Sequence, residues 1–310
     1  METAPLLNDL AEGPKGGVAW WLKAPDGLRI RAAYWPGGDK GTVLLFPGRT
    51  EYIEKYGRAA TELGQRGYGT LVIDWRGQGL ADRMARDPML GHVRRFANYQ
   101  MDVKAMVALA EGLELPKPWY LIAHSMGGCI ALRALHENLP VNAVAFSAPM
   151  WGINMASYLR PVAWTLSQAA SWVRTDKIFA PGTKRESYLK IAPYKDNMLT
   201  TDADMYAYMQ RHVAAEEKFG LGGPSLRWLN EALHETQRLR RLPAPTTPAL
   251  TQLGTDETVV DTRPVHSVMK GWRNGRLEMI EGARHEIMME KPGIRAGFFD
   301  AADRLFEANR

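Results

Sequence analysis

The sequence predicts an α/β fold, in which a mostly parallel sheet of eight strands carries helices on both faces. Short β-rich runs alternate with helix-length segments from residue 42 onward. Strands that alternate with helices in this way are typical of a parallel sheet. The alternation stops after Ser147 and resumes at Pro248. A largely helical segment is therefore expected to be inserted into the α/β core.

Eight runs have strand character, and the first two differ from the others. Residues 18–24 and 28–35 are joined through Pro25-Asp26-Gly27, which are residues typical of a tight turn. This spacing predicts an antiparallel hairpin at one edge of the sheet. The remaining strands are expected at 42–46, 69–74, 119–124, 142–147, 249–254 and 276–282. Helices are expected at 51–66, 96–112, 127–138 and 292–307.

The inserted segment has its own helical pattern. Helices are expected at 155–174, 202–218 and 225–241, separated by loops rich in Gly and Pro. We therefore divide the chain into a first part of an α/β core (1–150), a helical lid (151–247) and a second part of the core (248–310).

Composition narrows the class of protein. A formal net charge of +5 over 310 residues is mild, so it does not indicate a nucleic-acid partner. The single cysteine, Cys129, cannot form an intramolecular disulfide, and the first 17 residues contain early acids and no apolar stretch typical of a signal peptide. No run of about 18 apolar residues suggests a membrane span. A cytoplasmic protein is expected.

The segment LIAHSMGG, residues 121–128, predicts a nucleophile at Ser125. A hydrolytic serine stands on a sharp turn between a strand and a helix, with small residues two positions before and after it. Ala123 and Gly127 are small, a β-rich run precedes Ser125, and an amphipathic helix follows it. The alternative is a serine in an ordinary strand-to-helix turn.

The base that such a serine needs is predicted to be His285, which directly follows the last strand. Four other histidines lie in predicted helices, His92 precedes the serine, and His124 adjoins it and is expected to point away. The segment HEIMM resembles the zinc motif H-E-x-x-H, but Met289 occupies its last position. No metal site is therefore predicted.

The acid that orients the base is sought in LGTDETVVD, residues 253–261. Asp256 and Glu257 are adjacent at the end of a strand and point in opposite directions, so only one of them can face His285. Asp261 precedes a predicted helix and is better explained as its N-cap. The residues alone leave Asp256 and Glu257 open.

An oxyanion hole needs two backbone N–H groups. The first is expected from Met126, the residue after the nucleophile. The second is expected from Arg49, in the loop Pro47–Glu51 that follows an early strand. The alternative for this loop is a plain connection without a catalytic role.

Seven segments together resemble the α/β-hydrolase family, and more narrowly the monoacylglycerol lipase and bacterial lysophospholipase group. They are FPGRTEY (46–52), DWRGQGLADR (74–83), GHVRRFANYQMDV (91–103), AHSMGG (123–128), FSAPM (146–150), GTDETVV (254–260) and ARHEIMME (283–290). The resemblance implies the α/β-hydrolase fold and extends from about residue 18 to the C-terminus, weakest in the lid. The family's acid occupies the fourth position of G-x-x-[D/E]-x-[V/I]-V, which is Glu257 here, with Asp256 as the runner-up.

This chain departs from the pattern of the family at three positions. Aspartate is commoner than glutamate as the acid, many relatives have His-Gly where Pro47-Gly48 stands, and Ala123 replaces the first glycine of G-x-S-x-G. No cofactor is implied, because Asp82 stands where a dinucleotide fingerprint needs its third glycine.

Met and aromatic residues of the lid are candidates for contact with an acyl chain. They include Trp151, Met155 and Trp164, which we expect to bind substrate; the wider set is Tyr158, Trp172, Phe179, Met198, Met205, Met209 and Trp228. The alternative is that they pack the lid onto the core. An apolar stripe expected in 155–174 either packs against the core or makes transient contact with a membrane surface.

The expected function is that of a serine hydrolase which cleaves carboxylic esters of single-chain lipids through an acyl-enzyme on Ser125. The expected partner is thus a small lipid ester, at the inner face of the membrane or in the cytoplasm. Two alternatives remain. The same residues could cleave other small esters or amides, or transfer the acyl group to an alcohol. The fold could also serve a non-catalytic binding protein. The oligomeric state is not predicted.

Overall fold

A computed structural model describes residues 1–154 and 177–310. Its described residues form one sheet of nine strands in the order β1-β2-β3-β5-β4-β6-β7-β8-β9. The strands are β1 (Glu2–Ala4), β2 (Val18–Lys23), β3 (Arg29–Trp35), β4 (Thr42–Phe46), β5 (Gly69–Asp74), β6 (Trp119–His124), β7 (Val144–Ser147), β8 (Ala249–Gly254) and β9 (Gly275–Ile280). All eight predicted strands are present. The predicted number is one too low, because β1 has only three residues and no alternating pattern, and its extended form depends on pairing with β2.

The sheet is antiparallel at one end and parallel over the rest. β2 and β3 form the predicted hairpin, whose turn places Gly27 at a φ of +87°. β3 pairs antiparallel with β5, and the six strands β4 to β9 run parallel. The carboxyl ends of the six parallel strands therefore meet at one edge, which is where functional loops collect in such sheets.

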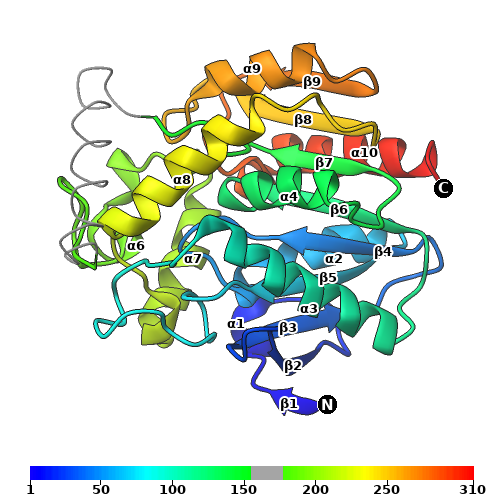
Figure 1. Cartoon of the computed structure of the whole chain (residues 1–310). Helices are drawn as coiled ribbons and strands as arrows, with labels where there is room; N and C mark the ends of the chain where they lie inside the picture. The colour runs from blue at the N-terminus through cyan, green and yellow to red at the C-terminus, as the bar shows by residue number, and fades with distance from the viewer. Residues whose placement is uncertain (155–176) are drawn as a thin grey trace.

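Helices cover both faces of the sheet (Figure 1). The α-helices are α1 (Asn8–Ala11), α2 (Gly57–Gln65), α3 (Tyr99–Gly112), α4 (Met126–His136), α6 (Tyr188–Ile191), α7 (Ala203–Ala215), α8 (Leu226–Leu239), α9 (Thr262–Lys270) and α10 (Pro292–Glu307). Short 3-10 helices are η1 (Ile53–Tyr56), η2 (Phe96–Asn98), η3 (Tyr194–Asp196), η4 (Glu217–Phe219) and η5 (Ile287–Met289). Two apolar clusters form the core: α3, α4, α8 and α9 pack on one face, and α2, α7 and α10 contribute to the other.

The centre of the sheet holds the most apolar strands. Every residue of β4, β5, β6, β7 and β8 is buried, as expected for parallel strands covered on both faces. β6 lies between β4 and β7, and α4 follows it directly. The turn between β6 and α4 therefore lies at the centre of the sheet, at the carboxyl end of β6.

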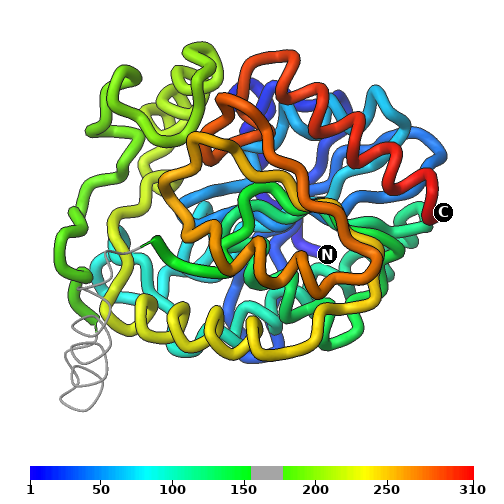
Figure 2. Tube along the Cα trace, turned by 90° about the horizontal axis from the view of Figure 1, so that it is seen from above, coloured from blue at the N-terminus to red at the C-terminus, as the bar shows by residue number. Residues whose placement is uncertain are grey.

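The segment after β7 is only partly described. The helix expected at 155–174 lies outside the described residues. The other two expected helices correspond to α7 with η4 and to α8. Each begins at a side-chain cap, because Asp202 accepts hydrogen bonds from two N–H groups of α7 and the Ser225 hydroxyl accepts one from Trp228. Residues 177–201 lie beyond the carboxyl ends of the parallel strands, and α8 runs back over one face of the sheet (Figures 1 and 2).

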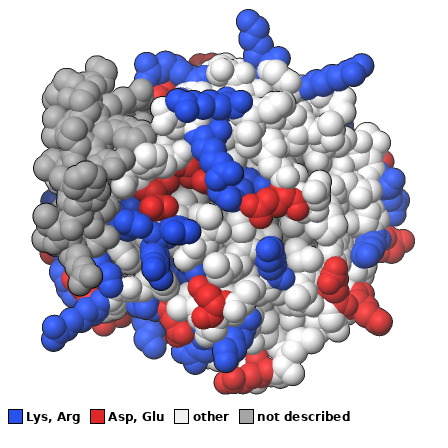
Figure 3. All heavy atoms as spheres, viewed as in Figure 1, with Lys and Arg blue, Asp and Glu red and all other residues white. Residues whose placement is uncertain are grey.

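On the face shown in Figure 3, Lys and Arg side chains are interspersed with Asp and Glu, in keeping with the mild net charge. None of the described helices combines the length and the apolar character that a bilayer span requires.

Candidate active site

Ser125 occupies a strained turn between β6 and α4. Its φ of +48° and ψ of −117° lie outside the regions that non-glycine residues ordinarily adopt. The turn is held by its own backbone, since the N–H of Ser125 donates to the carbonyl of Ser147 at 3.1 Å and its carbonyl accepts from Gly128 and Met150. This strained geometry is the one expected of a nucleophile turn.

The residues on either side of Ser125 explain the small side chains in LIAHSMGG. A Cβ on Gly127 would lie 2.2 Å from the carbonyl oxygen of Phe46, so no larger residue fits there. Ala123 is fully buried in β6, where it pairs with Phe46 on β4 and with Phe146 on β7. The structure thus accommodates one methyl group at the position that a glycine occupies in the G-x-S-x-G pattern.

His285 and Glu257 form a buried hydrogen-bonded pair. The Nδ1 atom of His285 lies 2.6 Å from Oε2 of Glu257. The other carboxylate oxygen accepts from the N–H groups of Val259 at 2.5 Å and Val260 at 3.1 Å. Burial alone would raise the pKa of Glu257, but His285 and these two N–H groups hold it below the ordinary value. Glu257 is therefore ionised at neutral pH and fixed in orientation.

The other two acids of the same segment do not reach His285. Asp256 is exposed, and its backbone N–H donates to the carbonyl of Ala283 at 3.0 Å. Asp261 is the N-cap of α9, as predicted, and also pairs with Arg263. The two neighbouring carboxylates thus point in different directions, and Glu257 is the one beside His285.

Ser125 and His285 line one cavity of about 280 Å³ at the carboxyl ends of the strands. Much of its wall is apolar, and residues of the inserted segment contribute to it. The lining includes Arg49, Tyr52, Met150, Ile153, Tyr188, Leu189, Met198, Leu199, Met209, Trp228, Val259 and Val260. The structure therefore brings together the serine and the histidine that sequence analysis selected.

The loop Pro47–Glu51 closes one side of this cavity and carries the second expected oxyanion donor. The Gly48 N–H donates to the carboxylate of Glu51, and the Gln78 side chain donates to the Gly48 carbonyl at 2.8 Å. Within residues 1–154 and 177–310, the N–H of Arg49 donates no hydrogen bond. Met126 is the first residue of α4, so its N–H has no acceptor in a preceding helical turn. Both N–H groups are available to a ligand.

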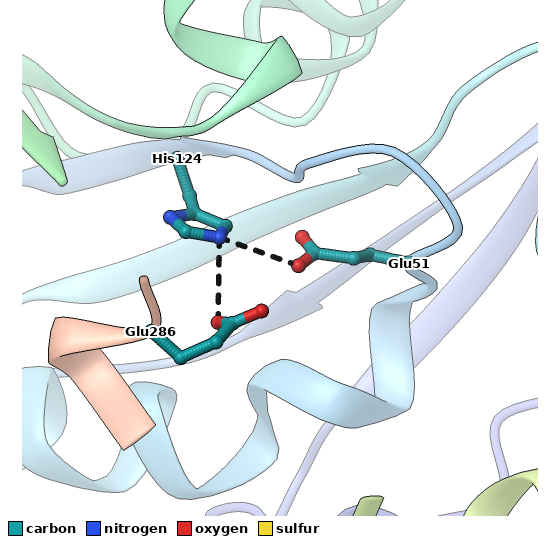
Figure 4. Close-up of side chains that lie close together, drawn as sticks. All are labelled: Glu51, His124 and Glu286. Carbon is teal, nitrogen blue, oxygen red and sulfur yellow. Dashed lines mark ion pairs between the residues drawn. The ribbon is translucent and has the colours of Figure 1, made fainter. Parts of the chain in front are cut away.

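A cluster of buried charges contributes Glu51, Lys55 and Glu286 to the cavity wall, and Figure 4 shows Glu51 and Glu286 with His124. His124 Nε2 lies 3.3 Å from a carboxylate oxygen of Glu286 and 3.5 Å from one of Glu51. The Lys55 ammonium contacts both carboxylates, at 2.6 Å for Glu286 and 2.5 Å for Glu51. The His124 ring lies 4.8 Å from the His285 ring, centroid to centroid. The cluster thus joins the loop before η1, the end of β6 and the loop that carries His285.

The charges in this cluster stabilise one another. Burial would lower the pKa of His124, but Glu286 and Glu51 raise it above its ordinary value. Burial would raise the pKa of Glu286, but His124 and Lys55 hold it well below its ordinary value. Glu51, His124 and Glu286 place ligand atoms within 4.8 Å of one another, a set that could hold a cation. Here Lys55 supplies positive charge at this place.

Glu286→Gln is expected to lower the free energy of unfolding by about 3–5 kcal/mol, because it leaves two buried cations short of a partner. Since the pKa of Glu286 is well below 4.5 in the folded protein, this stabilisation is present above about pH 4.5 and is lost as the pH falls through the folded-state pKa. Urea unfolding of both proteins from neutral to acid pH measures the difference. Glu281→Gln, at an exposed position, is the control, and equal effects of the two substitutions would contradict the prediction.

Some of the lid residues expected to bind substrate line the cavity, and others do not. Trp151 is 1% exposed, packs between Phe146 and Trp272, and donates from its indole to the Gly128 carbonyl at 3.0 Å. It is thus a core residue and is absent from the cavity lining. Met155 and Trp164 lie outside the described residues. From the wider set, Met198, Met209 and Trp228 line the cavity.

Three residues that the sequence did not predict also support the site. Gln78 holds the loop at Gly48, and Lys55 and Glu286 form an ion pair next to His124. Glu286 directly follows the predicted base, and Lys55 lies four residues after Glu51 in a predicted helix. Gln78 and Glu286 lie in segments of the family resemblance that assign them no role, and Lys55 lies outside those segments. Their proximity depends on the fold, because Lys55 and Glu286 are 231 residues apart in sequence.

Comparison with known proteins defines the class. The family described as serine aminopeptidase S33 (Hydrolase_4) matches residues 37–292. Lysophospholipase L2 of Escherichia coli strain K12 is 35% identical over 271 residues, covering 82% of this chain and 76% of that protein. A probable lysophospholipase L2 of Haemophilus influenzae is 28% identical over 255 residues, covering 82% and 79%. The chain belongs to this family of serine hydrolases.

Solved structures support the same fold. A soluble variant of monoglyceride lipase from Saccharomyces cerevisiae superimposes with a TM-score of 0.72 at 19% identity, covering 93% of this chain and 94% of that one. The monoacylglycerol lipase of Paleococcus ferrophilus gives 0.69 at 17% identity, covering 91% and 99%. The fold is therefore the predicted α/β-hydrolase fold. Within that fold the chain is a carboxylic ester hydrolase of the lysophospholipase and monoacylglycerol lipase group.

Proposed function

We propose that this protein hydrolyses carboxylic esters of single-chain lipids through an acyl-enzyme on Ser125. The observation that carries the proposal is the buried pair of His285 and Glu257 beside an apolar-walled cavity that Ser125 also lines. A flexible acyl chain suits a wall of Met and Leu side chains, because these adapt their shape at low cost. The names of the relatives, lysophospholipase and monoglyceride lipase, support the same class of substrate.

The proposed reaction has two halves. His285, held by Glu257 through Nδ1, takes the hydroxyl proton of Ser125 while the serine oxygen attacks the ester carbonyl. The N–H groups of Met126 and Arg49 stabilise the oxyanion, and His285 then gives its proton to the departing alcohol. Water, deprotonated by His285, attacks the acyl-enzyme, and the fatty acid leaves as Ser125 regains its proton.

The proposed organisation assigns residues 151–247 to a helical lid over the core parts 1–150 and 248–310. Residues of this segment, such as Met198, Met209 and Trp228, contribute to the cavity wall, which supports a role in enclosing the acyl chain. Because single-chain lipids partition into bilayers, the proposal includes transient contact with the inner face of the cytoplasmic membrane.

A mixed substrate pool tests the proposed function. The purified protein is incubated with lysophospholipids, monoacylglycerols, short-chain esters and acyl amides, with an acceptor alcohol present, and products are identified by mass spectrometry. Release of free fatty acid from the single-chain lipids is the expected result. Preferential cleavage of amides or short esters, or transfer of the acyl group to the alcohol, would favour the alternative reactions.

A further inference from the structure

The side chain of Arg49 lies in an unusual place for a cation. Arg49 lines the same cavity as Ser125. Its guanidinium donates from Nη2 to the carbonyl of Gly222 at 2.6 Å and lies over the Trp228 ring, with Cζ 5.2 Å from the ring centroid. A Cβ on Gly91 would lie 2.4 Å from Nη2, so the absence of a side chain there makes room for the guanidinium. The group is packed in place.

Arg49, which is half-buried, differs in its partners from the fully buried Arg31 and Arg76. Arg31 pairs with Glu54 and Asp74, and Arg76 pairs with Asp102. Within the described parts of the chain, Arg49 forms no ion pair with a carboxylate, and its Nε atom is buried without a hydrogen bond. Burial lowers its pKa to about 10, so it is still charged at neutral pH. Loss of hydration around such a charge is costly unless a partner compensates it.

The neighbouring acid is not free to be that partner. The Glu51 carboxylate already accepts from Lys55, Tyr56 and the Gly48 N–H. Lys55, the other cation on the cavity wall, is neutralised by Glu51 and Glu286. Among the cations that line this cavity in the described structure, Arg49 is thus the one whose charge the protein leaves uncompensated. An anionic group of the substrate would complete the site.

We propose that the Arg49 guanidinium binds the phosphate of a lysophospholipid head group, so that the enzyme prefers lysophospholipids to monoacylglycerols. This inference rests on the proposed function. The phosphate and the acyl ester are carried by the same glycerol unit, and the proposed oxyanion donor is the backbone of Arg49 itself. One residue therefore contacts both ends of the glycerol unit. A guanidinium matches the geometry of phosphate oxygens and is less strongly hydrated than an ammonium, which favours such a contact in an enclosed cavity.

The test compares two substrates with the same acyl chain, a lysophosphatidylglycerol and a 1-monoacylglycerol. Arg49→Gln is expected to lower the ratio of their kcat/KM values about 10- to 100-fold, because a hydrogen-bonded charge contact is lost. Arg49→Lys keeps the positive charge. Its ratio of kcat/KM values is expected to lie between those of Arg49→Gln and wild type, chiefly because the KM for the lysophosphatidylglycerol is lower than in Arg49→Gln. Arg276→Gln, an exposed arginine paired with Glu278, is the control and is expected to leave the ratio unchanged.

Several outcomes would overturn the inference. An unchanged ratio in Arg49→Gln, or equal losses on both substrates in Arg49→Gln and Arg49→Lys, would mean that Arg49 supports the loop without binding the head group. If Arg49→Gln relieved inhibition by the fatty-acid product and left the ratio of kcat/KM values unchanged, the guanidinium would bind the carboxylate of the product instead of a phosphate. Failure of the proposed function itself is separate, since it would appear as turnover of both lipids by Ser125→Ala.

Discussion

Ser125→Ala is expected to lower kcat for lipid-ester hydrolysis by about 10⁴- to 10⁶-fold. The substitution removes the oxygen that forms the acyl-enzyme and leaves only the oxyanion donors and the cavity. The fold is expected to survive, because the contacts that hold the turn are made by the backbone of Ser125 with Ser147, Gly128 and Met150. Hydrolysis is measured by fatty-acid release, labelling by a fluorophosphonate probe, and folding by thermal unfolding.

Ser147→Ala provides a matched control for this substitution. Ser147 is a buried serine at the end of the next strand, β7, and its hydroxyl has no hydrogen-bond partner within the described residues. The control is expected to keep the probe labelling and most of the activity. Turnover retained by Ser125→Ala would remove Ser125 from the mechanism, and failure of the wild-type protein to react with the probe would revive a non-catalytic role.

Glu257→Gln is expected to lower kcat by about 10³- to 10⁴-fold, since an amide can neither fix the His285 tautomer nor stabilise its protonated form. Asp256→Asn is expected to stay within about threefold of wild type, because this exposed carboxylate has no contact with His285 among the described residues. The two substitutions are matched in chemistry and adjacent in sequence. Steady-state kinetics on one lipid ester compares them directly.

The acid limb of the pH profile adds a second measure of the same pair. The pKa of Glu257 is below its ordinary value of 4.5, so its carboxylate persists and continues to support His285 as the pH falls to about that value. Activity of the wild-type protein is therefore expected to fall through protonation of this carboxylate only at a pH below that value.

A larger loss of kcat in Asp256→Asn than in Glu257→Gln would show that Asp256, and not Glu257, is the acid.

The sheet was predictable because its strands have strong local signals. Runs such as TVLLF and WYLIAH are apolar throughout, and a buried parallel strand requires this pattern. β1 was missed because Glu2–Ala4 has no such pattern and becomes recognisable as a strand only by its pairing with β2. Of the helices expected after β7, α7 and α8 were predictable from their periodicity, but the contacts of side chains in this part of the chain were not. Trp151 shows this, since its burial depends on Phe146 and Trp272.

The candidate site was predictable only where chemistry demands a motif. The turn at Ser125 needs small neighbours, and His285 follows a strand at a spacing that the topology allows. The choice of Glu257 came from a family pattern, and its contact with His285 depends on how the loop after β8 turns. No pattern pairs Lys55 with Glu286 in the sequence, because any buried pair of opposite charges satisfies the same electrostatic need. Such partners become apparent only in the folded chain.

The ion pairs of Lys55 also bear on how the enzyme is made. Lys55 leaves the ribosome 231 residues before Glu286, and His285 directly precedes Glu286. Until Glu286 emerges, Lys55 and His124 lack one of their acidic partners, and Ser125 lacks its proposed base. Under the proposed mechanism, a nascent chain that does not yet contain His285 cannot activate Ser125, so hydrolysis cannot begin before the strand β9 and the loop after it have been made.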